Sequence, residues 1–136
     1  MAKVKNKVGK IIIEPGVGNI LPWEMHSALA LKDAGYIVRF VPKHDSVCTA
    51  DAYLNNTLFE FKSPEGTRIK SVENNLQKAL RRQSKNVVID SCRIKNLKDK
   101  NIEKYLISRL KQKKGIGRLI FITKNGEAID INDRLC

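Results

Sequence analysis

A mixed α/β domain is the fold that the sequence predicts, and three observations support it. Short aliphatic runs such as "YIVRFV" and "NVVID" have the length and the β-branched content of strands. They alternate with longer segments whose apolar residues recur at helical spacing, which argues against a helical bundle or a β-sandwich. The chain has 136 residues, enough for one domain with its own core, so we expect a single unit over residues 1–136.

The first predicted elements follow a basic arm at residues 1–9, for which a mobile segment and a contact with a phosphate backbone both stay open. Pro22 suits the first turn of a helix and Gly35 suits its C-terminal cap, so we predict a helix over residues 21–34. Glu24 falls on the apolar stripe of this helix. A buried acid at that place needs a partner or a ligand.

Three strands and a second helix come next. "YIVRFVP" predicts a strand, and residues 49–66 supply two more around Asn55 and Asn56. A helix is predicted over residues 69–84, with Gln83 on its apolar stripe. "NVVID" then predicts a strand that is buried on both faces.

Residues 92–136 are predicted to add a third helix, "NIEKYLISRLKQKK", and a final hairpin, "GRLIFITKNGEAIDI". The Asn-Gly pair of this hairpin favours a type I′ turn. The complete order is helix, three strands, helix, strand, helix and hairpin. It predicts a mixed central sheet flanked by helices.

The net charge predicts a polyanionic partner. Lys and Arg total 26 against 14 Asp and Glu, which gives a formal charge of +12 and a pI near 9.8. Nucleic acid is the partner we favour over a generically basic surface or lipid headgroups. Cys48, Cys92 and Cys136 share no metal-ligand spacing and leave one cysteine unpaired in any disulfide scheme, which favours a reducing compartment. With no membrane span or signal peptide in the pattern, we predict a cytoplasmic protein.

The charges on the predicted hairpin suggest a metal site. A two-residue turn at Asn55 and Asn56 would place Asp51 opposite Glu60, and Lys62 would share the face of Glu60. Like charges placed opposite each other are unfavourable unless a cation lies between them, and Mg²⁺ prefers carboxylate oxygens. The alternative is a solvated surface on which the lysine pairs with the acids. Glu24 and Gln83 favour the site, because both are expected to point toward the same face of the sheet.

In the order of these elements the chain resembles the PD-(D/E)XK nucleases. A helix with Glu24 comes first, then Asp51, a strand with "EFK", a helix with Gln83, and a further strand. Within that superfamily the chain is similar to the C-terminal nuclease domains of CdiA-type contact-dependent growth inhibition toxins. The similarity covers "EMHSALALKDAGYIVRFVP", "ADAYLNNTLFEFKSP" and "ALRRQSKNVVID", with residues 21–91 as the matched core. Ala50 stands where the motif that names the superfamily has proline.

This resemblance implies a restriction-endonuclease-like core and a set of site residues. The expected metal is Mg²⁺ or Mn²⁺, with these ligands: Asp51, Glu60, the Phe61 carbonyl and Glu24. Lys62 would position or activate the attacking water, and Gln83 would steady the site or touch the substrate. His26 is expected to be a surface residue of its helix, and His44 a loop residue.

The expected function is metal-dependent hydrolysis of RNA, with tRNA the favoured substrate, by a growth-inhibition toxin domain that acts in the cytosol of a target cell. The resemblance also implies an acidic cognate immunity protein. Two alternatives stay open: a DNA endonuclease of a mobile element, and a basic binding module without turnover. Phosphates would be held mainly by cations on and beside the second helix: Arg68, Lys70, Lys78, Arg81, Arg82 and Lys85. Further cations follow the next strand: Arg93, Lys95, Lys98 and Lys100. Few aromatic residues are present, which favours recognition of backbone and shape.

Overall fold

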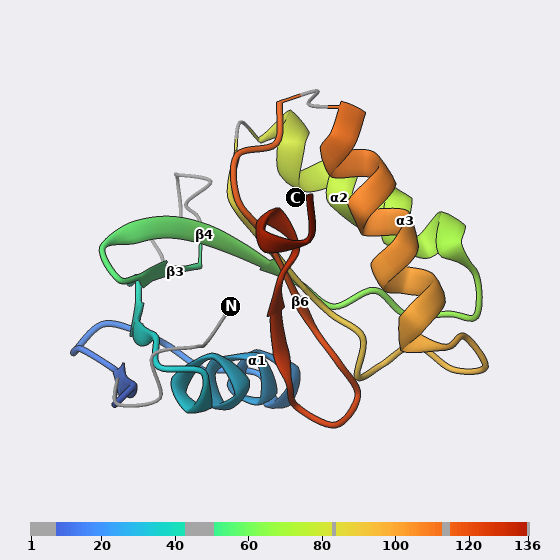
Figure 1. Ribbon diagram of the computed structural model, residues 1–136. Coiled ribbons are helices and arrows are strands. Elements are labelled where there is room, and N and C mark those ends of the chain that lie inside the picture. The colour runs from blue at the N-terminus through green and yellow to red at the C-terminus, as the bar shows by residue number, and fades with distance from the viewer. Residues whose placement is uncertain (1–7, 43–50, 83, 113–114, 136) are drawn as a thin grey trace.

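The computed structural model of the protein describes residues 8–42, 51–82, 84–112 and 115–135. Its strands are β1 (Lys10–Ile12), β2 (Ile37–Phe40), β3 (Ala52–Leu54), β4 (Thr57–Lys62), β5 (Val87–Asp90), β6 (Leu119–Ile122) and β7 (Ala128–Asp130). Its helices are α1 (Pro22–Asp33), α2 (Ile69–Arg81) and α3 (Asp99–Gln112), followed by the short 3₁₀ helix η1 (Ile131–Leu135). Figure 1 shows their arrangement. None of the described helices has the length and apolar character that a bilayer span requires.

The strands form one mixed seven-stranded sheet in the order β1-β2-β3-β4-β5-β6-β7. Three neighbouring pairs are parallel, namely β1 with β2, β4 with β5, and β5 with β6, and the other pairs are antiparallel. The predicted mixed α/β sheet is therefore confirmed. The predicted order omitted β1 and η1, which are both too short to carry a clear periodic pattern.

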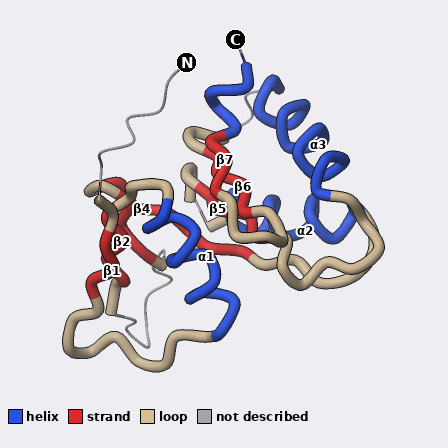
Figure 2. The backbone as a smooth tube through the Cα atoms, turned by 60° about the horizontal axis from the view of Figure 1, so that its bottom comes forward, coloured by secondary structure: helices blue, strands red, loops and turns tan. Residues whose placement is uncertain are grey.

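Strand β4 connects the two halves of this sheet. Its first half pairs with β3, ending at Ala52 and Phe59, and its second half pairs with β5, beginning at Glu60 and Val87. Figure 2 shows β1, β2 and β4 on one side and β5, β6 and β7 on the other. The sheet therefore changes partner strands between two consecutive residues, Phe59 and Glu60.

The core has two parts, one on each face of the sheet. On β5 and β6, Val88 and Ile120 belong to the cluster that includes α1, whereas Val87 and Leu119 belong to the cluster that includes α2 and α3. Side chains alternate between faces along a strand, so α1 covers one face and the other two helices cover the opposite one. Both central strands are buried at every residue, as the unbroken apolar run of β5 predicted.

Helix α1 begins and ends where the sequence predicted. Pro22 occupies its first turn, and the Glu24 carboxylate accepts the backbone N–H of Leu21 at 2.8 Å, which satisfies a donor at the helix start. Gly35 follows the last turn with φ +97°, the left-handed conformation that glycine adopts without strain. Helix α2 ends at Arg81, three residues before the predicted end at residue 84.

The two predicted hairpin turns have different outcomes. Asn55 and Asn56 have φ values of 48° and 72°, which fits a type I′ turn and confirms the predicted hairpin. The turn between β6 and β7 was predicted wrongly. Among its residues only Gly126 has positive φ, and the backbone N–H groups of Gly126 and Thr123 bond the carbonyls of Thr123 and Glu127. This is a three-residue loop that needs one left-handed residue rather than two.

Candidate functional site

A buried acid and a lysine from β4 lie side by side near the end of α2. Glu60 is 3% exposed, and its carboxylate lies 2.9 Å from the Lys62 ammonium. The Ser84 hydroxyl donates to the other carboxylate oxygen at 2.8 Å, and the Arg82 guanidinium lies 3.6 Å away. Phe59 and Phe61 pack in the cluster with α1, so Glu60 and Lys62 project from the opposite face of β4. The prediction that Lys62 shares the face of Glu60 is confirmed.

Asp51 reaches the same strand through a different contact. Its carboxylate accepts the backbone N–H of Phe61 at 2.7 Å. Its own N–H donates to the carbonyl of Phe59, which is the residue paired with Ala52. The regular pairing of β3 with β4 therefore ends before Asp51, and Asp51 does not stand directly opposite Glu60 as predicted. The two acids lie instead at the point where β4 leaves β3 and joins β5.

The remaining predicted site residues have different environments. Glu24 is 4% exposed on α1, the helix that covers the face bearing Phe59 and Phe61. Across the described part of the chain, the ligand atoms of Glu24, Asp51 and Glu60 do not form a group within 4.8 Å of one another. Gln83 and His44 lie outside the described residues. The predicted roles of these side chains stay predictions.

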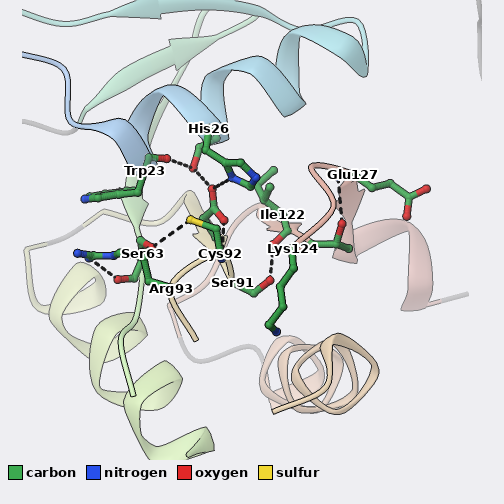
Figure 3. A network of polar contacts seen from close by, with 12 residues as sticks. Trp23, His26, Ser63, Ser91, Cys92, Arg93, Ile122, Lys124 and Glu127 are labelled. Carbon is green, nitrogen blue, oxygen red and sulfur yellow. Dashed lines mark hydrogen bonds and ion pairs between the residues drawn. The ribbon is translucent and has the colours of Figure 1, made fainter. Parts of the chain in front are cut away.

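A second polar cluster lies on the other face of the sheet, at the end of β5 (Figure 3). Asp90 follows Val88 by two residues and therefore points toward α1, where it is fully buried. Its Oδ2 atom accepts hydrogen bonds from His26 Nδ1 at 2.7 Å and from the Ser27 hydroxyl at 2.6 Å. Its Oδ1 atom accepts a hydrogen bond from the backbone N–H of Cys92 at 2.9 Å. His26 is thus held by a buried carboxylate, and the prediction of a plain surface residue was wrong.

The Cys92 thiol in this cluster is a poor nucleophile. Burial and, after it, the charge of the nearby Asp90 carboxylate together raise the pKa of Cys92 to about 11. His26, Asp90 and Cys92 offer ligand atoms within 4.8 Å of one another, a set of types that zinc accepts. However, His26 Nδ1 and both oxygens of Asp90 already take part in hydrogen bonds, so the cluster is satisfied without an ion.

The comparison with protein families identifies the chain. The model for the contact-dependent growth inhibition CdiA C-terminal domain matches residues 48–128, more than half of the sequence. The chain belongs to this family. It is therefore a CdiA C-terminal toxin domain, and the predicted role in growth inhibition is confirmed at this level.

One solved structure similar to this CdiA C-terminal domain is a chain of the CdiA-CT/CdiI toxin and immunity complex from Burkholderia pseudomallei. The TM-score is 0.68 and the sequence identity 20%, and the match covers 87% of this chain and 96% of the other. At this identity the match shows a shared fold. Curated protein sequences gave no match to the chain.

The cations predicted to hold phosphates are all exposed in this CdiA C-terminal domain: Arg68, Lys70, Lys78, Arg81, Arg82 and Lys85. The sequence reasoning missed Asp90 and Cys92 as members of a polar cluster. One feature could have pointed to them, because Asp90 ends an apolar run that predicts a buried strand. The partner on α1, in contrast, is 64 residues away from Asp90.

Proposed function

We propose that this CdiA C-terminal domain is a nuclease that hydrolyses phosphodiester bonds in RNA, with tRNA as the favoured substrate, inside the cytosol of a target cell. The observation that supports this most is the junction on β4. There, Glu60 is buried beside Lys62, and Asp51 is bonded to the same strand. Burying a charged acid costs free energy, so a glutamate that is 3% exposed at the point where the sheet divides is a candidate for a functional role.

The donor chemistry of the junction fits Mg²⁺ or Mn²⁺. Carboxylate oxygens come from Asp51 and Glu60, and oxygen ligands are the kind that these ions prefer. The residues proposed to hold the ion are Asp51, Glu60, the Phe61 carbonyl and Glu24. When bound, the ion would neutralise charge that develops on a phosphate during attack by water.

The chain's own groups prepare this site. The backbone N–H of Phe61 orients the Asp51 carboxylate, and the Ser84 hydroxyl orients that of Glu60. The Lys62 ammonium, 2.9 Å from Glu60, is placed to hold a water molecule or to offset negative charge on the phosphate. We expect Gln83 to steady the site or touch the substrate. The six exposed cations on and beside α2 would contact the phosphates of the substrate.

A cognate immunity protein is the proposed inhibitor. The similar fold from Burkholderia pseudomallei belongs to a toxin and immunity complex, which supports a partner of that kind here. A net charge of +12 favours an acidic surface on that partner.

The function is tested by incubating the purified domain with total tRNA, total RNA and plasmid DNA, each with Mg²⁺, Mn²⁺ or EDTA. Cleavage of RNA that EDTA stops is the expected result, and Glu60→Gln or Lys62→Met should reduce it at least a hundredfold. Lys104→Met is the matched control, because Lys104 is exposed on α3 and outside the proposed site.

Three results would count against the proposal. Cleavage of plasmid DNA alone would favour the DNA endonuclease, and binding of RNA without any cleavage would favour the binding module. Undiminished cleavage by both site variants would remove Glu60 and Lys62 from the mechanism.

A further inference from the structure

A pocket with an aromatic wall lies beside the Asp90 cluster. It has a cavity volume of about 450 Å³ and is lined by Leu21, Pro22, Trp23, His26, Cys92 and Arg93. This volume is in the range of small-molecule sites. Leucine, proline and tryptophan make most of the wall apolar, and the rest is one cation, one imidazole and one thiol. We propose that this pocket binds an unpaired nucleotide, with the base against Trp23 and the phosphate near Arg93.

Trp23 is suited to base stacking because it is only half-buried at the start of α1. Its indole ring is already within 5.3 Å of the Arg93 guanidinium carbon, measured from the ring centroid. An aromatic ring next to a guanidinium plane is the combination on which proteins stack unpaired bases. Figure 3 shows Trp23 and Arg93 adjacent at one end of the network.

Arg93 is held in place before any ligand arrives. Its guanidinium donates to the Ser63 carbonyl at 2.7 Å and to the Ser63 hydroxyl at 3.1 Å. Glu65 lies 3.5 Å away and is largely exposed, so its charge is screened by water. An arginine fixed by two hydrogen bonds to Ser63 keeps its charge beside the pocket and loses little rotamer entropy on binding.

His26 and Cys92 complete a wall without negative charge. Because a carboxylate only accepts hydrogen bonds, His26 Nδ1 carries the proton that Asp90 receives, and Nε2 is the ring nitrogen left to form a hydrogen bond with a base. Asp90 itself is fully buried and bonded by three donors. The Cys92 thiol is held neutral by its surroundings. An anionic nucleotide therefore meets no exposed carboxylate among the residues that line the pocket.

Two chain segments connect the pocket with the proposed cleavage site. Ser63, which holds Arg93, directly follows Lys62, and Trp23 directly precedes Glu24. The inference deepens the proposed nuclease function, since a base in this pocket would fix which phosphate of the strand lies next to Lys62. It also adds base recognition to the backbone recognition that the low aromatic content favoured.

The experiment measures nucleotide binding in EDTA, where no metal-dependent cleavage takes place. The chain contains a single tryptophan, so intrinsic fluorescence reports on Trp23 alone. The domain of residues 1–136 is titrated with 5′-AMP, 5′-GMP, 5′-CMP and 5′-UMP, and with ribose 5-phosphate as a probe that lacks the base. We expect saturable quenching by at least one nucleotide and none by ribose 5-phosphate at the same concentrations.

Variants then locate the binding. Arg93→Gln should weaken binding about tenfold, whereas Arg134→Gln, which removes an exposed arginine paired with Glu103, should leave it unchanged. Calorimetric titration of Trp23→Ala should show a loss of about tenfold or more, the usual cost of removing a stacked ring, and Trp23→Phe should stay close to wild type. Circular dichroism verifies that each variant is folded.

The outcomes separate the two proposals. Absence of saturable quenching by all four nucleotides, or equal quenching by ribose 5-phosphate, overturns the pocket. Unchanged affinity in both Arg93→Gln and Trp23→Ala overturns it as well. If the wild-type protein binds nucleotides in EDTA but cleaves no RNA with Mg²⁺ or Mn²⁺, that result contradicts the nuclease proposal and leaves the pocket standing.

Discussion

Replacing Lys62 by methionine should destabilise the domain through the acid that the lysine leaves behind. Glu60 is 3% exposed, so its carboxylate depends on protein partners for the solvation that water would otherwise supply. Breaking a buried ion pair by removing one member typically costs 3–5 kcal/mol. Here the Ser84 hydroxyl and the Arg82 guanidinium remain, and Lys62 is 16% exposed. We therefore expect Lys62→Met to lower the free energy of unfolding by about 2 kcal/mol.

The double variant Glu60→Gln/Lys62→Met isolates the cause. Glutamine removes the charge and keeps an oxygen for the Ser84 hydroxyl, so the double variant should lose only about 1 kcal/mol or less. Urea unfolding followed by circular dichroism measures both values, and about 2 kcal/mol corresponds to a midpoint shift of about 1 M for a domain of this size. The exposed Lys104→Met should change stability by less than about 0.5 kcal/mol.

The reasoning would be refuted if the double variant lost as much free energy of unfolding as Lys62→Met and Glu60→Gln lose together. Simple addition of the two effects would mean that the acid and the lysine do not interact. Both variants should lack cleavage, so stability and activity report on separate properties of the same pair.

Three further predictions rest on other parts of the structure. At pH 8 iodoacetamide should label Cys92 more slowly than a simple thiol peptide, because burial and Asp90 raise its pKa to about 11. Asp90→Asn should speed the labelling. Mass spectrometry of the tryptic peptide measures both rates, and a wild-type rate equal to that of the simple peptide would contradict the prediction. Burial tends to raise the pKa of Asp99, but hydrogen bonds from the backbone and side chain of Lys124 outweigh it and the net pKa is lowered. A lowered pKa stabilises the fold at pH values above the pKa of about 4 in the unfolded chain, and this contribution is lost as the pH falls through the pKa in the folded protein. In urea unfolding, the difference in stability between wild type and Asp99→Asn should therefore shrink below about pH 4. A difference that stays constant with pH would show that the charge contributes nothing. Asn56→Gly should raise the free energy of unfolding by about 0.5 kcal/mol, since φ is 72° at this position and glycine adopts it without strain; a lower melting temperature in calorimetry would refute this.

Patterns within single elements were predicted from the sequence because their causes are local. Pro22 and Gly35 mark a helix through backbone geometry that nearby residues define, and the pair Asn55 and Asn56 defines a turn in the same way. The unbroken apolar run of β5 predicted burial on both faces. The error at Asn125 and Gly126 has the same local origin, because that dipeptide suits more than one hairpin loop.

The sequence by itself determined that Glu24 would fall on the apolar stripe of its helix, that Lys62 would share a face with Glu60, and that the chain would carry a net charge of +12. Only the tertiary structure decided at which residue β4 stops pairing with β3 and begins pairing with β5. It also brought His26 into contact with Asp90, which is 64 residues away in the sequence. Periodicity encodes which side of an element is apolar, and this follows from the spacing of side chains along one backbone. Which elements then face each other depends on the packing of the whole sheet between its helices, a property that no single segment carries.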